Sequence, residues 1–314
     1  MQLSRVPEDV ARAGLRALYT VCIADGELSA LERAFLRGVQ DHVLHSHVDL
    51  DALEPIATDA LAAAIAPGAH RERVLAGAVI AACVDGRATD DEVDVLARLA
   101  TALELDPAPV RTARRLAKRH LLLARVDIAR RALAGHKVRQ TVREEGVIAM
   151  VAQLMPMMGI ADHALAARYR SLAASPAGTL GRAYFDFVES NGFSFPGEPG
   201  AGPEIIVVHD CLHVLGGYGT SPADEIEVAS FQAGCHGGDP LYGLLFGLAQ
   251  YHLGVQVAPV APAESMHADP ERMMRAFARG CRVERDMWSD FRPWDHFAKP
   301  LDALRAELNV LPTA

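Results

Sequence analysis

The chain has 314 residues, and its hydrophobic fraction of 50% is enough to build the cores of two ordinary domains. The formal net charge of -9 argues against a general nucleic-acid-binding protein, which needs a surplus of Lys and Arg to neutralise phosphates. Aromatic residues make up only 6% of the chain and its apolar residues are mostly Ala, Leu and Val, a composition that favours close-packed helices. We therefore expect an all-α fold.

The chain shows no signal for export or for crossing a membrane. Its start, MQLSRVPEDV, lacks the apolar core of a secretory signal, and no segment reaches the roughly 18 uninterrupted apolar residues of a membrane span. The five cysteines form no Cys-x-x-Cys pair, which is typical of reduced, buried thiols. We expect a cytoplasmic protein that forms a homo-oligomer and can contact the inner face of the membrane peripherally.

A repeat organises the first third of the chain. ALYTVCIADGELSALERAFLRGV starts at Ala17, and GAVIAACVDGRATDDEVDVLARL starts at Gly77. In each copy an apolar helix runs into Asp-Gly, and a second helix begins three residues later. Gly26 and Gly86 predict left-handed helix ends at these two Asp-Gly joints.

The residues after each glycine have the spacing of a capping box. Ser29 and Thr89 stand three residues before Glu32 and Glu92 and predict the start of the next helix. These acids, with the Asp of each joint, therefore have a structural role, although a shared divalent cation remains an alternative. Residues 8 to 105 resemble the TerB-like family of tellurite-resistance proteins in the two turns IADGELSALE and CVDGRATDDE, which implies a helical bundle that serves as an accessory module.

A basic segment follows, and we expect it to be a helix that links two domains. RTARRLAKRHLLLARVDIARRALAGH has Leu and Val at helical spacing with arginines between them, and Asp127 is its only acid. One interpretation is a solvated linker, and the other is an electrostatic contact with anionic lipid headgroups or with the acidic domain before it. We divide the chain into a TerB-like domain (1–110), a basic helical linker (111–144) and a metal-binding domain (145–314).

Two histidines and a carboxylate stand close together in VVHDCLHVLGG. At 3.6 residues per turn, His209, Asp210 and His213 share one side of a helix. Their neighbours Val207, Val208, Leu212 and Leu215 indicate a largely buried segment, in which a metal ion would satisfy all three polar groups together.

The helix that follows supplies further acids. Ser221 and Pro222 predict its N-cap and first residue, which places Asp224 at the capping-box position. Glu225 is then free to return to the ion as a fourth ligand, with Glu227 as the fallback. Either Asp210 or Glu225 could instead orient a histidine by a hydrogen bond.

The pattern His-Asp-x-x-His, then eleven residues, then Glu resembles the signature of the Coq-four family of coenzyme Q (ubiquinone) biosynthesis. GTLGRAYFDF, HVLGGYG and RPWDHFAKPLDALRAEL extend the likeness over residues 145 to 312. The resemblance implies a mostly helical, membrane-associated domain that binds a divalent ion and isoprenoid lipids. It also implies oxidative decarboxylation of a prenylated hydroxybenzoate, in which a ring carboxylate is replaced by a hydroxyl, or a role as organiser of the quinone-biosynthesis enzymes.

The ligand types favour zinc, with iron or manganese as alternatives, and leave room for an open coordination position. Arg182 and Tyr184 are candidates for binding the aromatic head of the substrate, although a salt bridge on the helix surface would equally explain Arg182. An aromatic group near the C-terminus could line an isoprenoid channel or belong to the core. It consists of Trp288, Phe291, Trp294 and Phe297.

Two other classes of function remain open. In an HD-type metal-dependent phosphohydrolase, His163 and Asp286 would complete a site with His209 and Asp210. A metal-stabilised, lipid-binding scaffold would have no reaction at all. A zinc peptidase fits less well, because Asp210 occupies the place of the glutamate that acts as general base.

Overall fold

The computed structural model describes residues 6–132, 140, 142–143, 146–147, 155–258 and 261–310, and it is built from helices. The first half contains α1 (Glu8–Cys22), α2 (Ala30–Gly38), the π-helix η1 (Val39–Leu44), α3 (Thr58–Ala64), α4 (Ala69–Ala81), α5 (Asp90–Ala102), α6 (Ala108–Ala117) and α7 (Leu121–Arg131). The second half contains α10 (His163–Arg170), α11 (Leu180–Ser190), α12 (Val207–Gly216), α13 (Pro222–Gly234), α14 (Leu241–Tyr251), α15 (Pro270–Gly280) and α16 (Leu301–Glu307). Short 3-10 turns lie at η2 (Pro156–Met158), η3 (Ser171–Ala174), η4 (Glu204–Ile206) and η5 (Pro293–Asp295). The predicted all-α fold is confirmed.

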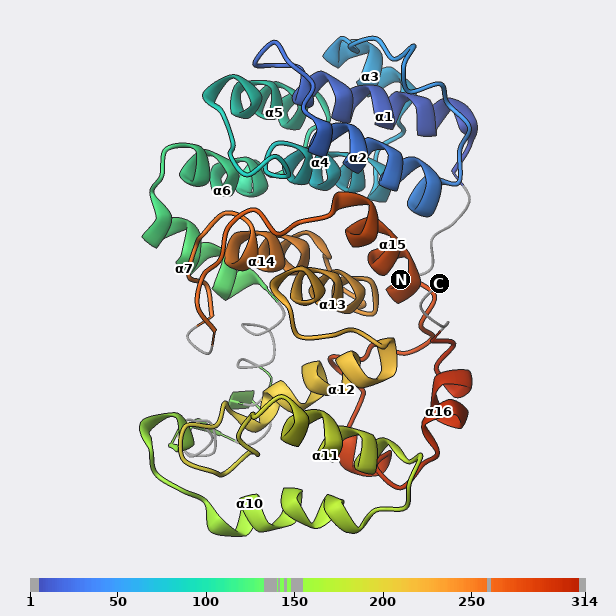
Figure 1. The fold of residues 1–314 in the computed structure, drawn as a ribbon. Coiled ribbons are helices and arrows are strands. Elements are labelled where there is room, and N and C mark those ends of the chain that lie inside the picture. The colour runs from blue at the N-terminus through green and yellow to red at the C-terminus, as the bar shows by residue number, and fades with distance from the viewer. Residues whose placement is uncertain are drawn as a thin grey trace.

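The helices are arranged in tiers (Figure 1). Helices α1 to α5 form one end of the molecule, α13, α14 and α15 lie in the middle together with α7, and α10, α11 and α16 form the other end. β-structure in the described ranges is limited to two isolated bridges, Thr179 with Pro300 and Leu253 with Ser265. None of the described helices is both long and apolar enough to span a bilayer. All five cysteines are buried and unpaired, as expected.

The two Asp-Gly joints have the predicted geometry. Gly26 and Gly86 take φ values of 100° and 99° after α1 and α4. Ser29 and Thr89 then form complete capping boxes with Glu32 and Glu92 at the starts of α2 and α5. Each such cap stabilises a helix by about 1 kcal/mol, so the repeat is specified by local interactions.

The sequence predicted a single helix in the basic segment, but the structure has two helices there, α6 and α7. α6 ends at Ala117 with Lys118 as its C-cap, and Arg119 takes the left-handed conformation with φ 53°. The N–H groups of Arg119 and His120 bond back to the carbonyls of Leu116 and Arg115, which closes a Schellman turn. No glycine marks this turn, so no local pattern in the sequence predicts it. Residues 133–139, 141 and 144 of the predicted linker lie outside the described residues.

Close contacts between α13, α14 and α15 hold the middle tier together. A side chain at Gly234 of α13 or at Gly280 of α15 would collide with the backbone of the other helix, at Phe277 or Phe231. Gly247 of α14 likewise lies against Ala229 and Ile226 of α13, and α14 is largely buried. Glycine is required at Gly234 and Gly280 because the two backbones approach there without room for a Cβ.

The apolar side chains form two clusters. The first joins α1 to α7 with α14 and α15, so the core of the N-terminal helices continues into the predicted 145–314 domain. The second is formed by α10, α11, α12 and the residues after α15, and it contains Tyr169, Tyr184, Phe195 and Phe297. Helix α13 contributes to both clusters, and it therefore sits at the boundary where its N-terminal end meets α12.

Candidate metal centre

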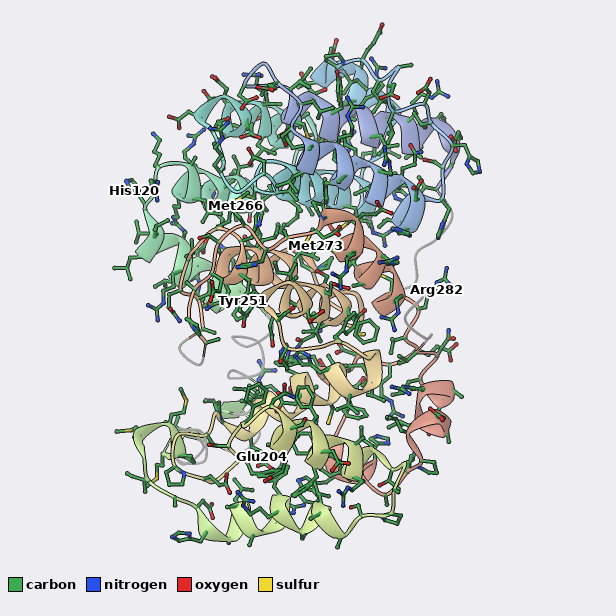
Figure 2. All side chains as sticks on the ribbon, in the orientation of Figure 1. His120, Glu204, Tyr251, Met266, Met273 and Arg282 are labelled. Atoms are coloured by element: carbon green, nitrogen blue, oxygen red, sulfur yellow. The ribbon has the colours of Figure 1, made fainter. Side chains whose placement is uncertain are left out.

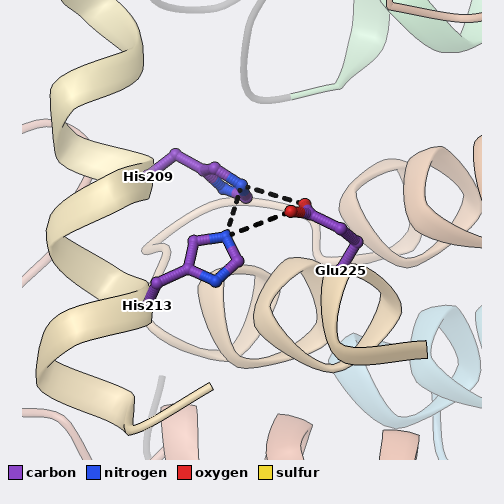
Figure 3. Close-up of side chains that lie close together, drawn as sticks. All are labelled: His209, His213 and Glu225. Atoms are coloured by element: carbon purple, nitrogen blue, oxygen red, sulfur yellow. Dashed lines mark hydrogen bonds and ion pairs between the residues drawn. The ribbon is translucent and has the colours of Figure 1, made fainter. Parts of the chain in front are cut away.

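Three side chains converge between α12 and the start of α13 (Figure 3). The Nε2 atoms of His209 and His213 are 3.1 Å apart. Glu225 places one carboxylate oxygen 3.3 Å from His209 Nε2 and the other 3.5 Å from His213 Nε2. Among the described residues, these three form the only group of three or more His, Cys, Asp and Glu side chains whose ligand atoms lie within 4.8 Å of one another.

The joint between α12 and α13 produces this convergence. Gly217 ends α12 in the left-handed conformation, with φ 73°, and its N–H bonds to the carbonyl of His213 at 2.8 Å. Ser221 then caps α13 in a capping box with Asp224, as the sequence predicted. Because Asp224 is occupied by the cap, Glu225 is the acid that turns back toward the histidines.

The outer ring nitrogens determine which way the lone pairs point. His213 Nδ1 lies 2.8 Å from the carbonyl oxygen of Gly219, and it must carry a proton to donate to that acceptor. His209 Nδ1 lies 3.0 Å from Gln232 Oε1 and donates in the same way. In the neutral rings both Nε2 atoms are then unprotonated. Two nitrogen lone pairs and a carboxylate thus face one point, an arrangement that only a cation or a shared proton can stabilise.

The pKa values reflect the same convergence. Burial alone would lower the pKa of His209, but the hydrogen bond and negative charge of Glu225 raise it to about 9. Burial opposes the ionisation of Glu225, yet hydrogen bonds to both histidines lower its pKa to about 2. Without a metal ion the group is therefore an ion pair in which His209 carries a proton. A divalent cation would replace that proton.

The site combines a shielded and an open side. The side chain of His213 is 2% exposed, whereas those of His209 and Glu225 are 25% and 17% exposed. Phe187 of α11 stacks on the His213 ring, with centroids 5.2 Å apart and planes at 27°. His213 is consequently held rigidly, while His209 and Glu225 border the side from which a ligand could arrive.

Asp210, the fourth predicted ligand, lies outside the group of three. It is one residue from His209, so the helix rotates it by about 100°. Burial, together with the charge of Glu225, raises its pKa to about 6, although the two histidines oppose the rise. The structure thus brings together three of the four predicted ligands. Glu227, the fallback, instead forms an ion pair with Arg272 at 2.5 Å.

The two residues predicted to bind substrate lie elsewhere. Arg182 is bound on the surface of α11 by Asp186, at 2.8 Å, and by the carbonyl of Ala173, which is the salt-bridge alternative. Tyr184 is fully buried in the second apolar cluster. Its side chain packs against Phe297 and Phe195, with ring centroids 5.4 and 6.4 Å away. Neither position is the open side of the centre.

The residues of the HD-type alternative do not meet at the centre. Asp286 pairs with His236 at 3.2 Å and accepts hydrogen bonds from backbone N–H groups, including that of Gly237. His163 is exposed at the first position of α10. The C-terminal aromatic residues belong to the second apolar cluster, where Trp294 packs on Tyr169 with centroids 4.9 Å apart. For these residues core packing is therefore sufficient.

Gln232, Phe187 and the Gly219 carbonyl were not found by reasoning from the sequence. Gln232 is seven residues after Glu225 on α13, which is two helical turns, so the same periodicity that united the histidines could have located it. Phe187 comes from a separate helix, and no local pattern connects it with His213. Gly219 acts through its backbone, which no residue type reveals.

No family model matches this chain, and no curated protein matches it either. The resemblances to the TerB-like and Coq-four families therefore rest on the sequence motifs alone.

Proposed function

We propose that His209, His213 and Glu225 bind one divalent metal ion, zinc in the first place. The single observation that supports this most strongly is that the donor atoms of all three residues face one point while the outer nitrogens of both rings are committed to Gly219 and Gln232. Two imidazoles and one carboxylate form a donor set used for catalytic zinc and for non-haem iron, and manganese accepts it as well. Hydrogen bonds from the outer nitrogens of metal-binding histidines to neighbouring acceptors are also typical of such sites.

We further propose that the protein acts in prenylated-quinone biosynthesis on an isoprenoid hydroxybenzoate. The motif His-Asp-x-x-His, eleven residues, Glu supports this substrate class, and His209 and Glu225 are partly exposed on the side from which a ring carboxylate would approach. When bound, the ion would act as a Lewis acid on the carboxylate or phenolate of the ring. His213, shielded by Phe187, would hold the ion in place, and Asp210 would lie beside the two histidines as a positioning residue.

The reaction implied by the resemblance replaces the ring carboxylate with a hydroxyl. The carbon to carboxyl bond breaks, carbon dioxide leaves, and one oxygen atom from dioxygen or a peroxide forms the new bond to the ring. With dioxygen, the second oxygen atom becomes water and takes two electrons from a reductant. Zinc has no redox chemistry, so turnover by the zinc-loaded protein would need a peroxide or an external electron donor.

The test uses purified full-length protein loaded with zinc or iron, a prenylated hydroxybenzoate with a carboxyl carbon label, and either a peroxide or dioxygen with an electron donor. We expect labelled carbon dioxide and the hydroxylated ring from the wild type, and neither product from His213→Ala. The matched control, His163→Ala, removes an exposed histidine of α10 that is not part of the centre and should react like the wild type. Metal and lipid bound without turnover would contradict the enzyme and favour a scaffold for the quinone-biosynthesis enzymes, and phosphate release from nucleotides would favour the HD-type phosphohydrolase.

A further inference from the structure

Helix α7 exposes an apolar face that packs against no part of the described structure. Leu122, Leu123 and Val126 are 70%, 54% and 57% exposed. Successive residues of a helix are about 100° apart, so these three side chains occupy one strip of the helix surface. His120, the residue before α7, lies at the edge of the molecule in Figure 2. Large apolar residues gathered on an edge of this kind usually contact a partner.

The strip is surrounded by positive charge. Residues 111–131 contain eight arginines and lysines and the single carboxylate of Asp127. Lys118 and Arg119 are exposed in the turn before α7, and Arg125 borders the strip. Within the described part of the chain, no carboxylate lies within 4.0 Å of these three cations. The strip thus has the composition of an interfacial helix in a protein whose net charge is -9.

The opposite face of α7 explains why the strip remains exposed. Ala124 and Ile128 are fully buried in the first apolar cluster. Asp127, also buried, accepts a hydrogen bond from Thr112 at 2.5 Å and pairs with Arg115 at 2.9 Å. α7 is therefore fixed to α6 by its inner side, and its leucines cannot turn inward without breaking these contacts.

We propose that the outer face of α7, with the turn before it, is a docking surface for an anionic lipid bilayer. Leu122, Leu123 and Val126 would insert at the level of the headgroups, and Lys118, Arg119 and Arg125 would pair with lipid phosphates. Apolar insertion and electrostatic attraction reinforce each other at such surfaces, and each cation adds measurably to binding. A second copy of the chain fits less well, because it would bring the same positive charges to the contact.

This proposal does not depend on the metal centre, which lies on α12 and α13. His213→Ala should bind vesicles as the wild type does, so a failure of one proposal leaves the other intact. The experiment is flotation of the full-length protein with vesicles of phosphatidylcholine, with and without phosphatidylglycerol. The wild type should float with the anionic vesicles alone, and added salt should weaken the binding.

Two variants separate the apolar and the charged contributions. Leu122→Gln/Leu123→Gln/Val126→Gln keeps the helix propensity and removes insertion, and Lys118→Gln/Arg119→Gln/Arg125→Gln removes charge. Each should lower the affinity for anionic vesicles roughly a hundredfold. The matched control is Arg12→Gln/Arg37→Gln/Arg98→Gln, which removes three exposed cations from α1, α2 and α5 and should float like the wild type.

A fluorescent probe tests the orientation directly. Val126→Trp places an indole on the strip, whereas the natural tryptophans, Trp288 and Trp294, pack in the second apolar cluster. Its emission should shift to the blue when anionic vesicles are added. Equal flotation of the wild type and both triple variants, equal binding to neutral vesicles, or an unshifted spectrum would overturn the proposal. So would a glutamine variant that dissociates an oligomer while vesicle binding stays unchanged, because a second copy would then cover the strip.

Discussion

Three helix joints in this chain are built alike, yet they place their acids in opposite environments. Each has a glycine in the left-handed conformation followed by a capping box: Gly26 with Ser29, Gly86 with Thr89, and Gly217 with Ser221. In the two Asp-Gly joints the capping acid is a glutamate that faces other carboxylates. In the joint between α12 and α13 an aspartate makes the cap, and the next residue is a glutamate that faces two histidines.

The pKa values of the two glutamates differ according to whether the glutamate makes the cap, as Glu92 does, or follows the capping aspartate, as Glu225 does. Burial, with the charges of Asp85 and Glu32, raises the pKa of Glu92 to about 8. The two imidazoles instead lower the pKa of Glu225 to about 2. A glutamate is thus shifted toward its protonated form in one joint and toward its ionised form in the other, because the groups that face it differ.

The largest expected effect is the loss of metal from Glu225→Gln. An amide supplies no negative charge to the ion, so the affinity for zinc should fall by more than about a hundredfold, beyond the range for residues that only orient a ligand. Zinc competition with a chromophoric chelator measures this value. Glu92→Gln, at the corresponding cap of α5, is the control and should leave zinc affinity unchanged.

Gln232→Leu should have the next largest effect. It removes the acceptor for His209 Nδ1, which lies 3.0 Å away, while keeping the side chain volume similar. The ring then loses its fixed tautomer and orientation, and zinc affinity should fall by about tenfold to a hundredfold. The same chelator competition measures it, and an unchanged affinity would show that Gln232 does not position the ligand.

Glu92 should also make stability depend on pH. Because its pKa is raised in the folded state, the folded protein binds more protons than the unfolded chain between the ordinary value for glutamate and about 8. Its contribution to stability is therefore complete at low pH and is lost as the pH rises through that window, by at most about 1.4 kcal/mol per pH unit. Denaturant unfolding of wild type and Glu92→Gln should give curves that diverge in this direction, and parallel curves would contradict the assignment.

The smallest effects come from the caps themselves. Ser29→Ala, Thr89→Ala and Ser221→Ala should each destabilise the protein by about 1 kcal/mol, since each removes one acceptor from a helix start. Ser221→Ala alone should also weaken zinc binding, because the start of α13 positions Glu225. Thermal unfolding with and without zinc distinguishes the three variants. If zinc stabilised all three equally, the cap at Ser221 would not position Glu225 for metal binding.

Features that depend on residues close together in the sequence could be predicted, whereas features that depend on distant segments could not. Helical periodicity and capping patterns act between residues on the same helix or on two consecutive helices. They were enough to predict the Asp-Gly joints, the cap at Ser221 and the convergence of His209, His213 and Glu225. The turn at Arg119 was missed because an arginine adopts a conformation that glycine usually marks. Burial of Tyr184 and stacking of Phe187 on His213 depend on contacts between distant segments, which local patterns do not encode.

The measurement that tests the central claim most directly is X-ray diffraction from crystals of zinc-loaded protein at the zinc absorption edge. We expect an anomalous peak about 2.0 to 2.2 Å from the Nε2 atoms of His209 and His213 and from a carboxylate oxygen of Glu225. An absent peak, or a peak at the Asp-Gly joints with none between α12 and α13, would contradict a metal centre at these three residues.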